Sequence, residues 1–92
     1  MKYEWDYRKN RNNIEKHGLD FNDAVLFFEN PYLTFSDLRF NYGEERYFAI
    51  GTIRSRVIVL IFTKRKDTIR IISMRKANER ESKKFKDRLG KN

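Results

Sequence analysis

The stretch Val57-Ile58-Val59-Leu60-Ile61-Phe62 is apolar at every position. A strand with one solvent-facing side alternates apolar and polar residues, so this uninterrupted run predicts a central strand that is covered on both faces. Its β-branched side chains favour a strand over a piece of helix. The run is far too short to span a bilayer, and we expect no membrane association.

Further strands are predicted on both sides of this run, because apolar segments alternate with turn residues. They form an antiparallel meander of about four strands, at residues 32–40, 46–53, 57–62 and 68–75. Arg54-Ser55 and Lys66-Asp67 are short enough for tight turns, and a longer turn is expected at 41–44. Gly51 predicts a bulge or a close approach of another segment within its strand.

Helices are predicted on either side of the meander. After a short strand at residues 2–5, Asp6 is a suitable N-cap for a helix that runs to about Lys16 and ends at His17-Gly18. A second helix has Asp20 as its cap, and its predicted core-facing stripe consists of Phe21, Ala24, Val25 and Phe28. A last helix is expected from about residue 78 to 89. The fold class is therefore α+β: two N-terminal helices on a curved antiparallel sheet, then a C-terminal helix, within one domain over residues 1–92.

Composition narrows the possible chemistry. The 92 residues include no cysteine and one histidine, so disulfides and thiolate metal sites are excluded, and we expect neither a metal site nor a cofactor. Met1 to Asp6 lacks the apolar stretch of a signal peptide, and we expect a cytoplasmic protein.

The positive charge is concentrated in the last third of the sequence. Residues 64–92 hold 12 Lys and Arg against 4 Asp and Glu, whereas residues 1–63 hold 9 of each, so residues 64–92 carry the whole net charge of +8. A clustered basic surface predicts a nucleic acid partner.

Arginines are the main candidates for contact with phosphate, because the guanidinium fork matches phosphate oxygens and stays charged. We expect Arg65 and Arg75 to form a phosphate clamp, with Arg46, Arg70 and Arg80 as weaker candidates. Arg70 and Arg75 lie five residues apart on one strand, so alternation predicts that they point to opposite faces. The alternative is that these arginines pair with carboxylates, for which the candidates are Glu45, Glu79 and Glu81.

His17 is the only residue of the type that exchanges protons near neutral pH, so it is a candidate general acid or base. It also fits a structural role beside the carbonyl groups at a helix end. Lys16 is either a phosphate contact or a solvated helix residue. Trp5, Tyr7 and Tyr47 could stack on bases, although core packing is the stronger reading for Trp5.

Two sets of residues resemble the BrnT toxin family, and the similarity covers about residues 3–85. The N-terminal set is Trp5-Asp6 with Lys9, Asn13-Ile14-Glu15-Lys16-His17-Gly18, Phe21 and Ala24; the second is Glu45-Arg46, Gly51, and Arg70-Ile71-Ile72-Ser73-Met74-Arg75-Lys76-Ala77 with Glu81. Two positions depart from the family pattern: Phe85 stands where the family often has tyrosine, and Ser82 where a basic residue is common. We therefore assign Phe85 no catalytic role.

The resemblance implies a RelE-like fold and the toxin of a type II toxin–antitoxin pair, with RNA as substrate and translation arrested by its cleavage. It also implies a BrnA-like antitoxin that covers the site and carries the operator-DNA contacts, so that DNA is bound only indirectly. Carried onto this chain, the catalytic candidates are Lys16, His17, Arg65 and Arg75, and the RNA-binding candidates are Arg46, Arg70, Arg80 and Lys83. Our hypothesis is metal-independent cleavage through attack of the ribose 2′-hydroxyl. The alternatives are a non-catalytic nucleic-acid-binding module and a module that binds an acidic protein.

Overall fold

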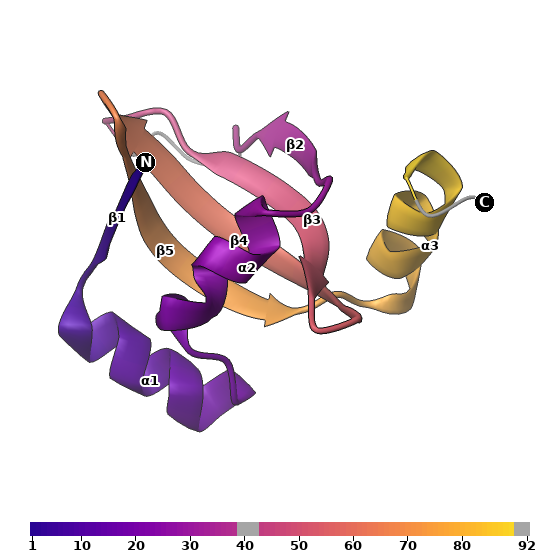
Figure 1. Cartoon of the computed structure of the whole chain (residues 1–92), viewed down its shortest axis with the longest axis horizontal. Helices are drawn as coiled ribbons and strands as arrows, with labels where there is room; N and C mark the ends of the chain where they lie inside the picture. Colours follow the sequence, from indigo (N-terminus) through magenta and orange to yellow (C-terminus); the bar gives the residue numbers. More distant parts are fainter. Residues whose placement is uncertain (39–42, 90–92) are drawn as a thin grey trace.

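The computed structural model describes residues 1–38 and 43–89, and its centre is a curved five-stranded sheet (Figure 1). The strands, in chain order, are β1 (Lys2–Trp5), β2 (Leu33–Ser36), β3 (Tyr47–Ile53), β4 (Arg56–Arg65) and β5 (Thr68–Lys76). Their order across the sheet is β1-β5-β4-β3-β2. The apolar run 57–62 therefore lies in the middle strand, as predicted.

The antiparallel meander of four strands is confirmed as β2 to β5. β1 adds a fifth strand that pairs in parallel with β5, from Lys2 opposite Thr68 to Trp5 opposite Ile71, so the sheet is mixed rather than purely antiparallel. β2 is shorter than the predicted strand 32–40, and residues 39–42 lie outside the described part of the chain. Arg54 and Ser55 have φ of 49° and 71°, the left-handed conformation that a two-residue hairpin turn requires.

Within the described residues, four helical segments accompany the sheet: α1 (Tyr7–His17), the 3₁₀ turn η1 (Phe21–Asp23), α2 (Ala24–Phe28) and α3 (Glu79–Arg88). The predicted ends of α1 are confirmed. The side chain of Asp6 accepts hydrogen bonds from the backbone N–H groups of Arg8 and Lys9, and Gly18 ends the helix with φ of 69°. No helix within the described residues is long and apolar enough to cross a bilayer.

The second helix departs from its predicted stripe. Val25 is 40% exposed, whereas Phe27, which the prediction left out, is fully buried. The segment begins as a 3₁₀ turn, in which residues three apart eclipse each other, so Phe21, Ala24 and Phe27 share the core-facing side. Phe27 also explains Gly51: a Cβ atom at this position would lie 2.7 Å from the Phe27 ring, so the predicted close approach is confirmed.

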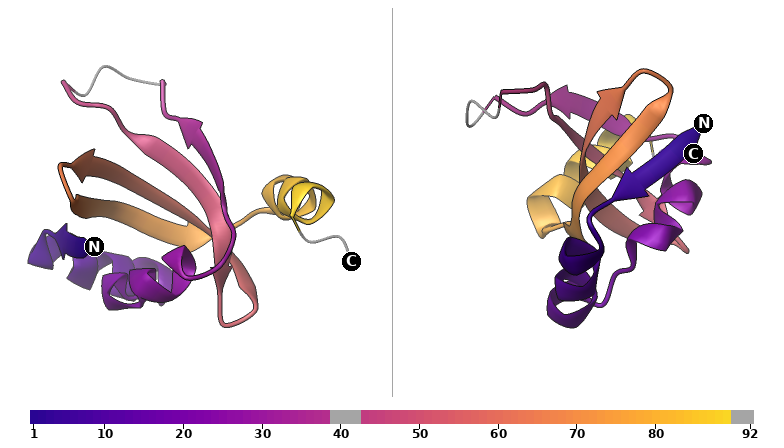
Figure 2. Two further views of the ribbon diagram at one scale, coloured as in Figure 1. Left: turned by 45° about the horizontal axis from the view of Figure 1, so that its top comes forward. Right: turned by 90° about the vertical axis from the view of Figure 1, so that its left-hand side faces the viewer.

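The sheet carries a core on each face. The first core packs η1 and α2 against Ile58, Leu60 and Phe62 of β4, and the second core packs Phe85 of α3 against Val59 and Ile61 of the same strand. Figure 2 shows α2 and α3 on opposite sides of the sheet. Trp5 belongs to the first core, where its ring packs edge-on against Phe21, so the core reading of this residue is confirmed.

Helix α1 is attached by polar side chains rather than by an apolar stripe. Its only buried residues are Asn10 and Asn13. Asn13 donates to the carbonyl of Leu19 (3.0 Å) and accepts from the backbone N–H of Met74 (3.2 Å), which lies beyond the point where β1 stops covering β5. Asn13 thus satisfies the free edge of β5 and holds the C-terminal half of α1 beside it.

Candidate functional site

A β-bulge decides which way the arginines of β5 point. Ile61 of β4 lies opposite Ser73, but the next residue, Phe62, lies opposite Ile71, so Ile72 is an extra residue in β5. Because of this insertion, Arg70 and Arg75 project from the same face of the sheet. The prediction of opposite faces is therefore wrong, since it assumed unbroken alternation.

We call this side of the sheet, which bears Arg65, Arg70 and Arg75 together with the second core, the arginine face. Arg75 lies opposite Val59, a second-core residue, and Arg70 lies opposite Thr63, four positions further along β4. Arg65 lies two residues after Thr63 in β4, so its side chain projects from the same face of the sheet. The face therefore gathers basic side chains from two neighbouring strands.

Three arginines and two glutamates form an ion-pair cluster at one end of the arginine face. The carboxylate of Glu4 lies 2.7 Å from Arg70 and 3.8 Å from Arg65, and Glu44 lies 3.3 Å from Arg65 and 3.7 Å from Arg46. The cluster joins β1, β4, β5 and the segment before β3. The Arg65 side chain is 54% exposed. Ion pairs this exposed contribute about 0–1 kcal/mol, so a phosphate can compete for these arginines.

Arg75 lies at the opposite end of the face and has a firmer partner. Its Nη1 and Nη2 atoms donate to the two carboxylate oxygens of Glu81 at 2.8 and 2.9 Å. The guanidinium carbon lies 5.9 Å from the centre of the Phe48 ring, over its face. The hydrogen bonds from Arg75 hold the pKa of Glu81 below its ordinary value. Of the carboxylates predicted as partners, Glu81 is confirmed; Glu45 instead accepts from the Tyr47 hydroxyl.

His17 and Lys16 lie on α1 rather than on the arginine face. His17 is half-buried and follows Asn13 by one helical turn, so both side chains lie on the same side of α1. Since Asn13 bonds to Met74 and α1 ends one turn later, His17 lies toward the Arg75 end of β5. Lys16 is exposed. The structure thus brings His17 and Arg75 to one end of the sheet.

Arg65 lies at the other end. It pairs with Thr68, whereas Arg75 pairs with Val59, six positions from Arg65 along β4, which is roughly 20 Å at the rise of a strand. Arg65 and Arg75 are held by different carboxylates at opposite ends of β5. The expectation that these two arginines form one phosphate clamp is therefore wrong, because most of the length of β5 separates them.

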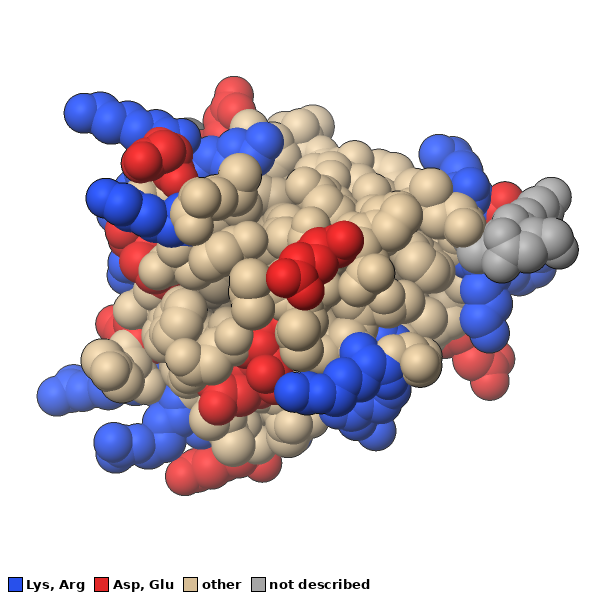
Figure 3. All heavy atoms as spheres, viewed as in Figure 1, with Lys and Arg blue, Asp and Glu red and all other residues tan. Residues whose placement is uncertain are grey.

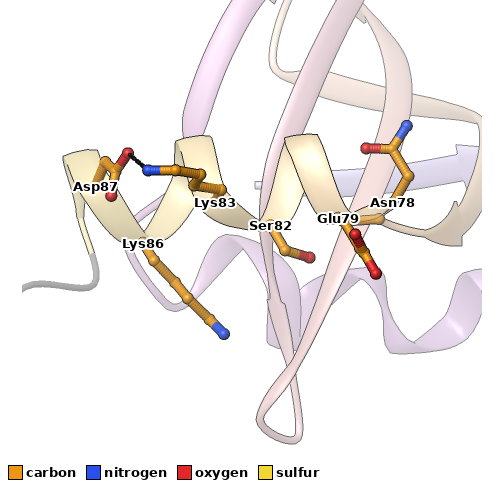
Figure 4. Close-up of a pocket in the computed structure, with 7 residues that line it drawn as sticks. Asn78, Glu79, Ser82, Lys83, Lys86 and Asp87 are labelled. Carbon is orange, nitrogen blue, oxygen red and sulfur yellow. Dashed lines mark hydrogen bonds and ion pairs between the residues drawn. The ribbon is translucent and has the colours of Figure 1, made fainter.

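The basic residues of α3 face solvent. Arg80 and Lys83 are exposed, and Lys83 pairs with Asp87 at 2.9 Å. A cavity of about 450 Å³ runs along this helix; its lining residues are Ala77, Asn78, Glu79, Ser82, Lys83, Lys86 and Asp87. Figure 4 shows Glu79, Ser82 and Lys86 pointing to one side of the helix. Lys83 is the only predicted site residue in that lining.

Basic side chains are unevenly distributed over the molecule. Figure 3, which shows the molecule from the direction of Figure 1, places Lys and Arg around the margins of this view and leaves its middle largely without them. Within residues 1–38 and 43–89, no group of three or more His, Cys, Asp and Glu side chains is arranged to hold a metal ion.

Sequence reasoning missed Glu4, Glu44 and Phe48 as parts of the site. Glu4 reaches Arg70 only because β1 pairs in parallel with β5, 66 positions away, and no local pattern indicates such pairing. Phe48 is a typical strand residue, and its place under Arg75 follows from strand register alone.

A small α+β domain with guanidinium groups spread over one sheet face has the chemistry of a protein that binds a phosphate polymer. The family model described as the ribonuclease toxin BrnT of type II toxin–antitoxin systems matches residues 5–81. Because the match covers most of the sequence, the chain belongs to this family, and the resemblance noted from the sequence is confirmed. No curated protein matches the chain.

Membership of the family defines the function in outline. The chain is a ribonuclease toxin of a type II toxin–antitoxin system, which implies an RNA substrate and a cognate antitoxin. The two N-terminal helices, the curved sheet and the C-terminal helix agree with the expected RelE-like fold, extended by β1.

Proposed function

We propose that the chain cleaves RNA by attack of the ribose 2′-hydroxyl on the adjacent phosphorus, without a metal ion. The new bond joins the 2′-oxygen to phosphorus, and the bond from phosphorus to the 5′-oxygen breaks. The proton of the 2′-hydroxyl passes to a base, and a proton is delivered to the leaving 5′-oxygen. The products are a 2′,3′-cyclic phosphate and a 5′-hydroxyl end.

In this proposal Arg75 stabilises the charge that develops on the phosphoryl oxygens. The observation that carries the proposal is its setting: Arg75 is anchored by both oxygens of Glu81, yet 38% of its side chain stays exposed. A donor fixed before the substrate arrives needs little reorganisation in the transition state, and loss of one such donor typically costs about 10²–10³ in rate.

His17 is the proposed proton carrier, and Lys16 is proposed to contact the phosphate beside it. What supports this assignment is that α1 places His17 at the same end of β5 as Arg75. A positioned acid or base contributes about 10²–10⁴ in rate. Since the chain has one histidine, the other proton transfer must involve a different residue or water.

Arg65, Arg70 and Arg46 are proposed to hold neighbouring phosphates of the same RNA strand, and Arg80 and Lys83 to extend that contact along α3. The ion-pair cluster supports this role, because it gathers three guanidinium groups and the Arg65 side chain is 54% exposed, so a phosphate can compete for its ion pairs. Arg65 was predicted to be catalytic, and replacing it distinguishes that role from a phosphate contact. Loss of a phosphate contact weakens RNA binding, whereas loss of a catalytic group lowers kcat.

The test compares an RNA oligonucleotide with the same oligonucleotide carrying one 2′-deoxyribose at the cleaved position. We expect the RNA to be cut to a 2′,3′-cyclic phosphate and the deoxy substrate to stay intact. Arg75→Ala should lower kcat by about 10²–10³. The matched control is Arg54→Ala, which removes the same charge and an exposed single-contact ion pair, to Asp23 at 3.2 Å, and should leave the rate unchanged. Cleavage of both substrates at equal rates would disprove the mechanism.

We also propose a BrnA-like antitoxin as the partner that covers the arginine face, with operator DNA bound only through the antitoxin. The proposal includes a cytoplasmic site of action, because the substrate is RNA and the proposed outcome is an arrest of translation. We propose that residues 1–92 act as one domain, because a single sheet supports both cores.

A further inference from the structure

Glu81 makes two sets of contacts at once. It is the third residue of α3, and its Oε1 atom accepts from the backbone N–H of Asn78 (2.9 Å) while the Asn78 side chain accepts from the backbone N–H of Glu81 (2.8 Å). This reciprocal pair is a capping box, which fixes the first turn of the helix. The same carboxylate holds both terminal nitrogens of Arg75. One side chain therefore ties the start of α3 to the guanidinium on β5.

These contacts restrain Arg75 in more than one direction. The two hydrogen bonds to Glu81 fix the guanidinium within its plane, the Phe48 ring lies under it at 5.9 Å, and Nη1 also donates to the carbonyl of Lys76 at 3.3 Å. A bidentate fork adds geometric specificity that a single ion pair lacks.

Burial shows which partner faces the solvent. The Glu81 side chain is 16% exposed and the Arg75 side chain is 38% exposed, so the carboxylate lies inward and the guanidinium outward. Glu81 is also held by the helix cap, so it cannot swing away without breaking the first turn of α3. A phosphate can therefore approach Arg75 from the solvent side while Glu81 keeps its place.

We infer that Glu81 is a positioning residue for RNA cleavage: it holds the Arg75 guanidinium in the orientation in which it meets the transition state. The inference rests on the proposed function, in which Arg75 is catalytic. Glu81 itself contacts no substrate in this scheme. Glu81 affects cleavage only by positioning Arg75, so replacing Glu81 should have no effect on cleavage when Arg75 is absent.

The experiment measures kcat and KM on an RNA oligonucleotide for Glu81→Gln, Arg75→Ala and the double variant. Glutamine keeps an oxygen for the Asn78 cap but cannot offer two acceptors to the guanidinium. We expect Glu81→Gln to lower kcat by about 10–100-fold with little change in KM, as for a misplaced catalytic group. In the Arg75→Ala background the same substitution should have no further effect, because residues that act as one unit are not additive.

The matched control is Asn78→Ala. It removes the other half of the capping box and should lower the melting temperature at least as much as Glu81→Gln, yet leave kcat near the wild-type value. The inference is overturned if Asn78→Ala lowers kcat as much as Glu81→Gln, if Glu81→Gln still lowers kcat in the Arg75→Ala background, or if Glu81→Gln binds RNA more tightly at unchanged kcat, which would make Glu81 a competitor of phosphate. If Arg75→Ala itself cleaves normally, the proposed function fails instead.

Discussion

Asn13→Ala is the substitution that tests most directly how this fold places its N-terminal helix. Asn13 is 8% exposed and joins three segments: its amide nitrogen donates to the carbonyl of Leu19, and its amide oxygen accepts from the backbone N–H of Met74. Alanine keeps the helix but removes both hydrogen bonds. It leaves a backbone donor on β5 and a backbone acceptor after α1 without the partner they had.

The expected cost follows from these two groups. A buried polar group that loses its partner costs about 1–3 kcal/mol, and alanine recovers about 0.5 kcal/mol through its higher helix propensity. We therefore expect Asn13→Ala to lower the free energy of unfolding by about 2–4 kcal/mol. For a domain of this size the melting temperature should fall by about 10–20 °C.

Urea unfolding followed by fluorescence gives the measurement, because Trp5 is the only tryptophan and its ring packs on Phe21 in the first core. The matched control is Asn12→Ala. Asn12 is the exposed neighbour of Asn13 on the same helix, so its replacement should be neutral or stabilise by about 0.5 kcal/mol. If the two variants unfold at the same urea concentration, the side chain of Asn13 does not hold α1 to the sheet and our account of this helix is incorrect.

Three further predictions concern the cores and the ion pair beside α3. Gly51→Ala should destabilise by about 1–3 kcal/mol in urea unfolding, because the new methyl group would lie 2.7 Å from the Phe27 ring; a neutral result would mean that the ring moves freely. Phe85→Ala should cost about 3 kcal/mol in the same assay, whereas Leu89→Ala, at a half-exposed position, should cost much less; equal losses would contradict the assignment of Phe85 to the second core. The lowered pKa of Glu81 means that its ion pair stabilises the fold above the ordinary value of 4.5 and stops doing so as the pH falls through the folded value. Glu81→Gln should therefore lose less stability than the wild type between pH 7 and pH 3, and parallel losses would argue against this linkage.

The elements that sequence reasoning found are those with a strong local signal. The unbroken apolar run from Val57 to Phe62 identified the central strand, and the capping residue Asp6 with the terminal Gly18 identified α1. The elements it missed depend on distant partners. β1 was expected as a strand, but its parallel place beside β5 has no local signal. Val25 was also predicted to face the core, on the assumption of 3.6 residues per turn. It is exposed because the segment begins as a 3₁₀ turn, which has a different repeat.

The burial of two polar residues of α1, Asn10 and Asn13, could not be predicted from the sequence either. A pattern-based reading takes Asn10 and Asn13 as part of a solvated surface, since asparagine is mostly exposed in proteins. Their burial becomes intelligible only when the groups that they satisfy are known: the backbone N–H of Phe21 for Asn10 and that of Met74 for Asn13. Asn13 belongs to the stretch that resembles the family and leads to His17-Gly18. Its contact with the backbone N–H of Met74 gives it a structural role at the edge of β5 and needs no catalytic role.

The arrangement of the arginines depends on Ile72, the extra residue in β5, which has no reactive group of its own. Alternation along β5 puts Arg70 and Arg75 on opposite faces, and no residue type around Ile72 marks the extra position that overturns this result. The bulge arises from the pairing of β4 with β5, so it becomes visible only when both strands are in place. Without it, Arg75 would point toward the first core and away from Glu81, while Arg70 would keep Glu4. The bulge is therefore what allows a single strand to present two guanidinium groups on one face, about four strand residues apart in space.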